Sequence, residues 1–490
     1  MSTDYDVIVI GGGAGGLSAA GIATHLGAKT TMIERARLGG DCTWTGCVPS
    51  KTLLKAAKVA QQSRTASKYG LVDQEVEVDF QGVMEHVRSV REGVYEEADR
   101  PEIFEEMDID VRSGDAHFVD AHTVAVHRSE GTTEQITGRF IIIAAGAHPI
   151  VPPIPGLDEV EYLTSETLFE LEDQPDRLAV VGAGPIGMEM AQAFARLGSE
   201  VTVVDMLDHV VSGDDRELTE MLRGVLEDEG VEFVLGAQVE EVSKRAGDIL
   251  VETTNGTSAQ IEADALLLAT GRAANVDGLN LDAAGVEHTR NGISVDDRCR
   301  TSQGHIYAVG DVTGRYQFTH MSNHMAKVAV TNALLKVPTT IDSDHVPHVT
   351  YTDPELAHVG ARATDLDEQG VTYDTYRFPY EKLDRAITEG ETTGLIKVHA
   401  TSLTGTILGA SVLGARAGEL ITSFTIAMRN GVSLRNIGDT IHPYPAWGEG
   451  VRRVADQWYV QKQSPTFTKI LQTVFGYRGP VIEPDPDEII

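Results

Sequence analysis

Two cysteines, Cys42 and Cys47, are separated by four residues in the segment GGDCTWTGCVPSK (residues 39–51). An expected helix, VPSKTLLKAAKVAQQ, begins directly after Cys47. A thiolate near a helix N-terminus has a lowered pKa, which thiol–disulfide exchange requires. The third cysteine, Cys299, has no partner in the sequence and is expected to be a structural thiol. Metal binding is disfavoured because no second Cys/His cluster completes a tetrahedral set, so the pair predicts redox chemistry.

Two segments share one pattern, in which a strand, a glycine-rich turn and a helix lead into a second strand that ends in an acid. The first has strands at 5–10 and 30–33, the turn GGGAGG, a helix to about residue 25, and then Glu34. The second has strands at 178–181 and 201–204, the turn GAGPIG, a helix to residue 197, and then Asp205. Each acid stands 18 residues after the last glycine of its turn. This is the fingerprint of a dinucleotide-binding βαβ unit in its proper context.

The three glycines of each turn have separate tasks. In the first unit Gly11 allows the tight turn, Gly13 lets the backbone approach a pyrophosphate, and Gly16 lets helix and strand pack closely. The corresponding residues of the second unit are Gly182, Gly184 and Gly187. The pyrophosphate lies at the helix N-terminus, where free N–H groups favour an anion. Because Glu34 and Asp205 can accept hydrogen bonds from ribose hydroxyls, two dinucleotides are expected.

The chain is strongly acidic, with a net charge of −34 from 74 acidic and 40 basic residues among 490. Such a surface repels nucleic acid and anionic membranes, so neither is an expected partner. The acids are spread through every region, and concentrated salt would screen their repulsion, which favours a halophilic cytoplasm. No apolar run approaches the roughly 18 residues of a membrane span. The start, MSTDYDVIVI, lacks the basic segment of a signal peptide, so we expect a soluble, cytoplasmic protein.

The rest of the chain provides further strands and a change of texture. The segment RFIIIAAG (139–146) predicts a buried strand before a Pro-rich linker, DALLLATGR (264–272) closes the second unit, and GHIYAVGDVTG (304–314) is the return of the chain. From about Val346 strands and hairpin turns predominate, and an amphipathic helix is expected around 419–429. This region has no glycine-rich phosphate loop, so its expected task is assembly.

Over nearly its whole length the chain resembles a class I pyridine nucleotide–disulfide oxidoreductase. The motifs that carry the resemblance are GGGAGG with Glu34, the Cys42–Cys47 motif with Lys51, IIIAAG, GAGPIGMEM, ATGRAAN, IYAVGDV, YTDPELAHVG, AGELI and HPYPAWGE. The resemblance implies an α/β, glutathione-reductase-like fold with two Rossmann-like dinucleotide-binding domains and a C-terminal α+β dimerisation domain. The implied division is an FAD-binding domain in two parts (1–150 and 273–345), an NAD(P)-binding domain (151–272) and a dimerisation domain (346–490) that forms a homodimer.

The same resemblance implies the cofactors and the site residues. FAD would lie on the first unit and NADPH or NADH on the second, with Asp311 on the ribityl chain of FAD. Lys51, paired with Glu189, would lie beside the flavin. Cys47 would be the charge-transfer thiol, and Cys42 the interchange thiol that attacks the substrate. The further implied contacts are Gly40, Ala116, Ala145, Gly146 and Thr319 for FAD, and Gly271 for the nicotinamide dinucleotide.

The C-terminal motif departs from the family pattern. Disulfide reductases of this family carry a His-Pro-Thr motif, with a Glu a few residues later, and that His serves the partner subunit's thiols as acid/base. Here Glu449 is in place, but Tyr444 occupies the position of the His and His442 falls two residues earlier. Tyr444 has the better alignment and His442 the more suitable pKa range, so both remain candidates. A purely structural turn is the third alternative.

Tyr at that position resembles mercuric reductases, but the C-terminal cysteine pair by which those enzymes deliver Hg(II) is absent. We therefore expect a reductase of a small disulfide, with bis-γ-glutamylcystine as the natural substrate in a halophilic cytoplasm. Hg(II) reduction and dihydrolipoamide dehydrogenation are the alternatives, and the missing His at position 444 disfavours the second. A flavin-binding subunit without turnover is the alternative from another class, which the intact Cys42, Cys47 and Lys51 disfavour.

The preferred nicotinamide coenzyme is left open. Asp205 suits a ribose 2′-hydroxyl and would repel a 2′-phosphate, and no Arg occupies positions 205–209, so the motif favours NADH. Thiol-buffer reductases and mercuric reductases of the family mostly use NADPH, and high salt weakens the repulsion from one carboxylate. We therefore lean slightly to NADPH.

Overall fold

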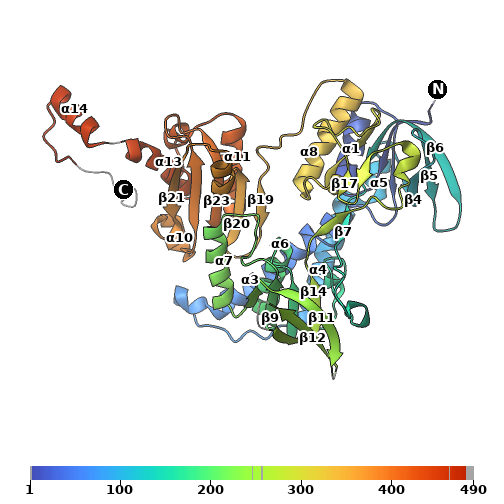
Figure 1. Ribbon diagram of the computed structural model, residues 1–490, viewed down its shortest axis with the longest axis horizontal. Coiled ribbons are helices and arrows are strands. Elements are labelled where there is room, and N and C mark those ends of the chain that lie inside the picture. Colours follow the sequence, from blue (N-terminus) through green and yellow to red (C-terminus); the bar gives the residue numbers. More distant parts are fainter. Residues whose placement is uncertain (1–2, 246, 255–257, 463, 482–490) are drawn as a thin grey trace. The chain divides into compact units, whose positions relative to one another are not determined.

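A computed structural model describes residues 3–245, 247–254, 258–462 and 464–481 of the chain (Figure 1). The chain divides into two compact units. The N-terminal unit consists of Met1–Arg64, Gln74–Met206 and Val231–Asp342, and the C-terminal unit of Thr65–Asp73, Leu207–Gly230 and Ser343–Ile490. Within the described residues, no helix is both long and apolar enough to cross a membrane.

The first sheet of the N-terminal unit has a parallel part and an antiparallel part. The parallel strands, in spatial order, are β3 (Ile109–Ser113), β2 (Thr30–Glu34), β1 (Tyr5–Ile10), β6 (Thr133–Ile143) and β18 (Ile306–Ala308). The N-terminal part of β6 pairs with β5 (Thr123–His127) in antiparallel register, and β5 pairs in the same way with β4 (Asp115–Phe118). Strand β1 is almost continuously buried, as expected for a parallel strand covered on both faces.

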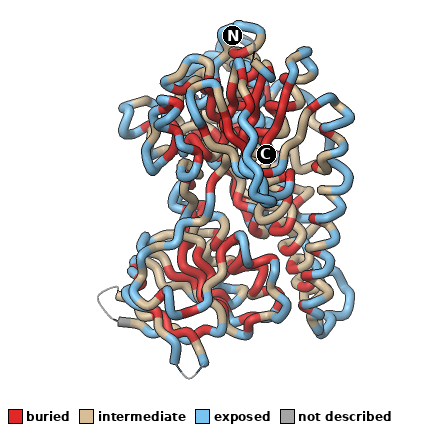
Figure 2. The backbone as a smooth tube through the Cα atoms, turned by 90° about the vertical axis from the view of Figure 1, so that its right-hand side faces the viewer, coloured by how far each residue is buried: buried red, intermediate tan, exposed pale blue. Residues whose placement is uncertain are grey.

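Alternation along β1 separates the two cores of this sheet. Val7 and Val9 pack with helix α1 (Ala14–His25) and helix α8 (Thr319–Val330), whereas Ile8 and Ile10 face the opposite side. Because successive side chains of a strand point to opposite faces, one hydrophobic run serves both layers. In Figure 2 the buried residues (red) follow the strands and the exposed ones (pale blue) lie mainly on helices and loops.

A second parallel sheet comes later in the same unit, with the order β10 (Glu232–Leu235), β9 (Glu200–Asp205), β8 (Arg177–Val181) and β14 (Ala265–Leu268). Helix α6 (Pro185–Leu197) connects β8 and β9. An antiparallel sheet of β11 (Gln238–Arg245), β12 (Asp248–Thr254) and β13 (Ser258–Ala263) packs beside it through a shared core. A short pair joins β7 (Ala147–Pro149) and β15 (Arg272–Ala274), and another joins β16 (His288–Thr289) and β17 (Gly292–Ile293).

Helices between these strands carry the two cysteines Cys42 and Cys47. Further helical segments of the N-terminal unit include α2 (Gly40–Trp44), α3 (Cys47–Arg64), α4 (Phe80–Val94), the π-helical turn η2 (Tyr95–Asp99) and α5 (Pro101–Glu105). Helix α3 begins at Cys47, so the predicted helix after the cysteine pair is confirmed.

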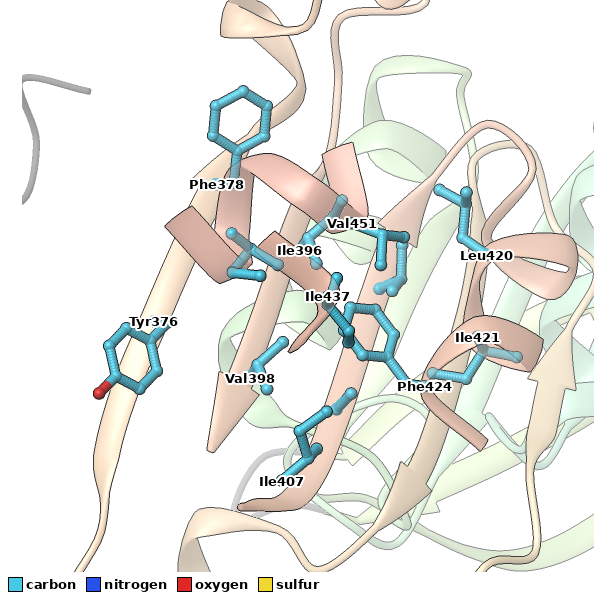
Figure 3. Close-up of a cluster of buried hydrophobic side chains, with 14 of the residues drawn as sticks. Tyr376, Phe378, Ile396, Val398, Ile407, Leu420, Ile421, Phe424, Ile437 and Val451 are labelled. Atoms are coloured by element: carbon cyan, nitrogen blue, oxygen red, sulfur yellow. The ribbon is translucent and has the colours of Figure 1, made fainter. Parts of the chain in front are cut away.

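The C-terminal unit is built on an antiparallel sheet, in the order β19 (His348–Thr350), β20 (Glu355–Gly360), β23 (Ile407–Gly414), β22 (Leu395–Ala400) and β21 (Asp374–Pro379). Its helices are α7 (Arg216–Asp228), α9 (Ala363–Glu368), α10 (Asp384–Glu389), α11 (Ala417–Arg429), α12 (Leu434–Gly438), α13 (Glu449–Lys462) and α14 (Pro465–Phe475). Figure 3 shows the core of this unit, where Phe424 and Ile421 of α11 face Ile396, Val398 and Ile407 of the sheet.

Helix α7 belongs to the C-terminal unit although it comes after β9 of the second dinucleotide-binding unit in the chain. Polar contacts hold its N-terminal end there: His348 Nε2 lies 2.9 Å from Asp214 Oδ1, and Lys397 Nζ lies 2.7 Å from Asp215 Oδ2. Both carboxylates are nearly inaccessible to solvent, so each needs such a partner. Sequence periodicity gave no indication of this association.

The predicted α/β class is confirmed: two Rossmann-like parallel sheets precede a C-terminal α+β unit. The predicted strand–helix–strand segments coincide with β1, α1 and β2, and with β8, α6 and β9. The predicted amphipathic helix around 419–429 is α11.

Candidate active site

The two glycine-rich turns have nearly the same geometry. Gly11 and Gly182 have φ angles of 108° and 113°, a backbone region that favours glycine. A Cβ on Gly16 or on Gly187 would collide with the carbonyl oxygen of the first glycine of its own turn, so each helix can pack close to its strand only without a side chain. Gly13 and Gly184 have no backbone oxygen or side chain within 4 Å of the position of a Cβ.

Each acid at the end of the second strand closes its own turn. Glu34 Oε2 accepts a hydrogen bond of 2.6 Å from the backbone N–H of Gly12, and Asp205 Oδ2 accepts one of 2.6 Å from that of Ala183. The other oxygen of Glu34 accepts from the N–H of Ala36 at 2.8 Å. These bonds fix each carboxylate beside the glycine turn, so both turns fit a dinucleotide whose pyrophosphate lies at the start of the next helix.

The two redox-type cysteines lie on different helices. Cys42 is in α2, Cys47 is the first residue of α3, and both are free thiols. Their sulfur atoms are within hydrogen-bonding reach of each other, and Thr319 Oγ1 at the start of α8 lies 3.3 Å from Cys47 Sγ. Segments far apart in the sequence therefore meet at the thiol pair.

The two thiols differ in acidity. A hydrogen bond from Cys42 lowers the pKa of Cys47 to about 6, and the hydroxyl of Thr319 and the charge of Lys51 act in the same direction. The pKa of Cys42 is raised, chiefly because its thiol donates to the Cys47 sulfur and because it is partly desolvated. At neutral pH the reduced pair therefore holds one negative charge, on Cys47.

An ion pair lies one helical turn beyond Cys47. Lys51 Nζ is 2.8 Å from Glu189 Oε2 of α6, and the side chain of Glu189 is only 6% exposed. A buried carboxylate is costly without a cation, so Glu189 fixes the position of Lys51. Helix α6 belongs to the second dinucleotide-binding unit, and the structure thus brings a residue of that unit to the thiol-bearing helix of the first.

A charged group that the sequence argument did not single out pairs with Asp41, the residue before Cys42. Arg272 forms an ion pair with Asp41, donates to the carbonyl of Ala147 at 2.9 Å, and lies 3.9 Å from Asp311 Oδ2. Desolvation raises the pKa of Asp311 to about 6, with Arg272 opposing the shift. The motif ATGRAAN contains Arg272, but its spacing from Asp41 and Asp311 in the sequence gave no sign that the three would meet.

The other predicted cofactor contacts are distributed around the same strands. Gly40, with a φ of 57°, has Gly13 as the close neighbour of its Cα. Asn275 holds the turn after β6, because its side chain donates to the carbonyl of Ala145 at 2.8 Å and its backbone N–H to that of Gly146 at 3.0 Å. Ala116 is half-buried in β4 and pairs with Val126 of β5.

Gly271 comes after β14, at the carboxyl end of the second parallel sheet. Its φ is 116°, and its carbonyl accepts a hydrogen bond of 2.9 Å from the backbone N–H of Ile150. The structure thus places this residue at the same end of the sheet as the second glycine turn, because β14 and β8 run parallel.

The three C-terminal candidates, Tyr444, Glu449 and His442, belong to the C-terminal unit. Tyr444 is 68% exposed, and a hydrogen bond to Asp384 raises its pKa. Glu449 is buried at the start of α13, where Arg452 lies 3.2 Å from its Oε1. Its Oε2 and the Nε2 of His442 are buried, and neither atom has a hydrogen-bond partner among the residues that the structure describes. Burial raises the pKa of Asp456 on the same helix as Glu449.

Among the described residues, no group of three or more His, Cys, Asp and Glu side chains has the arrangement of a metal site. Cys299 is fully buried, which raises its pKa to about 12, and its Sγ lies 3.6 Å from the carbonyl of Met325. Its surroundings are those of an unreactive core thiol.

Comparison with known proteins decides the family. The model of pyridine nucleotide-disulphide oxidoreductases matches residues 5–326, and the model of the dimerisation domain of these enzymes matches residues 346–455. The chain belongs to this family. It is an oxidoreductase of the FAD-dependent type that takes electrons from NAD(P)H. The resemblance inferred from the motifs is therefore confirmed.

The similar proteins differ in what they act on. A mercuric reductase from Lysinibacillus sphaericus is 37% identical over 459 residues, covering 92% of this chain and 82% of its own. Dihydrolipoyl dehydrogenase 2 from Haloarcula marismortui is 34% identical, covering 93% and 97%. Among solved structures, the HOCl-induced flavoprotein disulfide reductase RclA from Escherichia coli has a TM-score of 0.82 at 30% identity, covering 92% and 99%. The likeness shows flavoprotein disulfide oxidoreductase activity without selecting a substrate.

Proposed function

We propose that this family member is an NAD(P)H-driven reductase of a low-molecular-weight disulfide, with bis-γ-glutamylcystine as the best candidate substrate. The observation that carries the proposal is the polarised thiol pair, in which Cys47 has a pKa of about 6 and Cys42 keeps its proton. Two thiols of different acidity suit sequential thiol–disulfide exchange. Cys42 attacks the substrate after it loses its proton, and Cys47 is the thiolate that resolves the mixed disulfide.

The residues proposed to hold FAD are those of the first glycine turn with Glu34, together with Gly40, Ala116, Ala145, Gly146, Asp311 and Thr319. The second turn with Asp205, together with Gly271, would hold the nicotinamide dinucleotide. When bound, FAD accepts a hydride from NAD(P)H and supplies the two electrons that reduce a disulfide. The division into domains at residues 150, 272 and 345 is part of the same proposal.

The thiols of this chain then carry out a balanced exchange. Once the acid/base has taken its proton, Cys42 attacks one sulfur of the substrate disulfide, which forms a mixed disulfide and releases the first thiolate. The Cys47 thiolate attacks the Cys42 sulfur, which breaks the mixed disulfide, releases the second thiolate and restores the Cys42–Cys47 disulfide. One substrate disulfide, two electrons and two protons thus become two thiols.

The protons require an acid/base, which we assign to the C-terminal unit of the partner in a homodimer. The match to the family's dimerisation domain over residues 346–455 supports the dimer. The buried Nε2 of His442 has no partner among the described residues and could exchange a proton with a thiol, whereas Tyr444 has a raised pKa and can only donate. Glu449 would orient whichever group acts.

Two experiments test this assignment. The turnover of H442N compared with that of Y444F shows which side chain is the acid/base. Sedimentation at molar salt tests the dimer, and an active monomer would exclude it.

Hg(II) reduction is the second candidate, supported by the 37% identity to a mercuric reductase. Removing Hg(II) from tight thiol ligands calls for further thiols, and the sequence has no cysteine beyond Cys299. A disulfide needs only one attack and one resolving thiolate, both of which the pair supplies. Dihydrolipoamide dehydrogenation is supported by the similar haloarchaeal dehydrogenases but lacks the His expected at position 444.

Anaerobic turnover in molar salt tests the substrate directly. The panel contains bis-γ-glutamylcystine, glutathione disulfide, Hg(II) in excess thiol, and NAD⁺ with dihydrolipoamide, each measured with wild type and with C42S. We expect the γ-glutamyl disulfide to give the highest kcat/KM and C42S to abolish it. Rapid NAD(P)H oxidation by Hg(II) with every disulfide inert would instead establish the mercuric activity.

A further inference from the structure

A second layer of contacts supports the short helix α2 that carries Cys42. The support comes from the end of α4 and from the π-helical turn η2 that continues it. Arg91, Tyr95 and Asp99 are four residues apart along this segment, so they lie along one face. π-Helical turns are rare and occur frequently at functional sites, because the extra residue changes where the next side chains point.

All three side chains contact the residues that come directly after Cys42. Thr43 Oγ1 donates a hydrogen bond of 2.7 Å to Asp99 Oδ2, and both residues are buried. The rings of Trp44 and Tyr95 lie 5.2 Å apart, and Arg91 Nη1 donates to the carbonyl of Trp44 at 3.0 Å.

The residues that precede α2 also contact it. Trp44 Nε1 donates to the carbonyl of Leu38 at 2.8 Å, and the guanidinium of Arg37 lies 3.8 Å from the Trp44 ring. Gly39, the residue before α2, has a φ of 102°, and a Cβ there would lie 2.6 Å from Asp99 Oδ2 and 2.7 Å from Thr43 Oγ1. Asp99 therefore lies directly beneath the backbone turn that leads into Cys42.

Asp99 also acts on the charge of the thiol pair. The groups that act on the pKa of Cys42 are Cys47 at the start of α3, the hydroxyl of Thr319 on α8, and the carboxylate of Asp99 on η2. Asp99 contributes to the raised pKa of Cys42, after the hydrogen bond to Cys47 and desolvation. Lys51 acts on the other thiol, since its charge lowers the pKa of Cys47.

We propose that Asp99 is a positioning residue of the redox pair: through Thr43 it orients the helix that carries Cys42, and its buried carboxylate keeps the negative charge of the reduced pair on Cys47. The proposal rests on the assignment of Cys42 as the thiol that attacks the substrate. Asp99 touches neither thiol through a hydrogen bond of its own, so its effect is on orientation and charge distribution.

The test is the pH dependence of thiol alkylation in the reduced FAD-loaded enzyme. Iodoacetamide is added at a series of pH values, and fragment-level mass spectrometry measures the rates at Cys42 and Cys47 separately. D99N keeps the shape of the side chain and removes its charge. We expect D99N to alkylate Cys42 about tenfold faster at pH 7 than wild type, as a shift of one pKa unit would give. The rate at Cys47 should change little, because Cys47 is already mainly the thiolate at pH 7.

Substitutions at Thr43 test whether the hydrogen bond to Asp99 orients α2. T43V keeps the volume and removes the hydrogen bond, so we expect kcat/KM for the disulfide to fall about tenfold, the loss from leaving a buried carboxylate without its donor. T43S should restore the rate. T45V is the matched control, because it makes the same change two residues away at a hydroxyl for which the described residues provide no partner. Thermal unfolding and flavin absorbance confirm that each variant is folded and loaded.

The outcomes separate the two proposals. If Cys42 is the reactive thiol but D99N leaves both alkylation profiles unchanged and T43V behaves like T45V, the role of Asp99 is excluded while the assignment of the thiols stands. If Cys42 is not alkylated at any pH and C42S retains full turnover, the assignment of the thiols is excluded and the role of Asp99 with it.

Discussion

The two dinucleotide-binding units are nearly identical at their glycine turns and differ in what surrounds them. In both, the first glycine has a positive φ, the last allows close packing, and an acid accepts a 2.6 Å hydrogen bond from the turn. The first turn, however, is approached by Gly40, whose Cα lies 3.6 Å from where a Cβ of Gly13 would be. The corresponding position at Gly184 has no atom within 4 Å.

The segments that come after the two units differ even more. Strand β2 of the first leads into α2 and α3, which carry the thiols. Strand β9 of the second leads into residues 207–230, which belong to the C-terminal unit. The binding motif is thus common to both, and the neighbours of the motif decide the chemistry. A turn that the start of α2 approaches suits a cofactor that stays, and a turn without such a neighbour suits a coenzyme that must leave after each hydride transfer.

The largest expected effect comes from the thiols that only the first unit possesses. We expect C47S to lower turnover by at least about 10³-fold, because the exchange loses its resolving thiolate. The variant should also lack the long-wavelength charge-transfer absorbance that a thiolate beside oxidised flavin produces after two-electron reduction. C42S is the matched control: it has no disulfide to reduce, so it should show that absorbance in the oxidised enzyme while losing turnover. A C47S variant with the absorbance intact contradicts the assignment.

The absorbance should depend on pH in a defined direction. Because the pKa of Cys47 is lowered to about 6, the thiolate and its charge-transfer absorbance should be present above that pH. Both should disappear as the pH falls through it, since the thiol then binds a proton. A titration of the reduced enzyme followed by absorbance measures the midpoint.

Paired substitutions at the last glycines sharpen the comparison of the two turns. Overpacking costs about 1–3 kcal/mol, equivalent to about 5- to 150-fold in binding. We expect G16A to lose bound FAD, measured as flavin absorbance per protein after gel filtration. G187A should keep its FAD and show a raised KM for the nicotinamide coenzyme. If both variants lose FAD, the assignment of one dinucleotide to each turn is wrong.

A smaller effect is expected at Asp205, the acid of the second turn. D205A removes the carboxylate that suits a 2′-hydroxyl and repels a 2′-phosphate, so kcat/KM for NADPH relative to NADH should rise about tenfold. The rise should be greater in dilute buffer than in molar salt, which screens the charge. The control is D208A, which removes an acid bonded to His209 and Arg216. An unchanged ratio in D205A would exclude this role for Asp205.

The smallest effect is expected at the ion pair that connects the two dinucleotide-binding units. K51M removes a cation that lowers the pKa of Cys47, so the midpoint of the charge-transfer absorbance should move upward, by about one pH unit. E189Q removes the partner that partly neutralises Lys51, so the midpoint should move downward by less. Shifts of the same sign in the two variants would contradict this account.

Much of the fold could be predicted because its signals are local. The glycine turns, the buried strands that flank them and the helix after Cys47 each depend on spacing within about twenty residues, and the structure confirms them. A lowered thiol pKa could be foreseen for the same reason, since Cys47 stands where a helix begins, whereas the separate roles of the two thiols were implied only by the family resemblance. The ordered motifs of the family implied the cofactors and the other site residues.

The tertiary structure alone decided which distant residues meet. Arg272 reaches Asp41 beside Cys42, Asp99 lies under Thr43, and helix α7 joins the C-terminal unit through Asp214 and Asp215. None of these residues has a local signature, because an isolated Asp or Arg in a sequence is usually a solvated surface charge. A buried charge needs a partner that only packing can bring to it, and so the sequence determines the reacting groups whereas tertiary packing determines their environment.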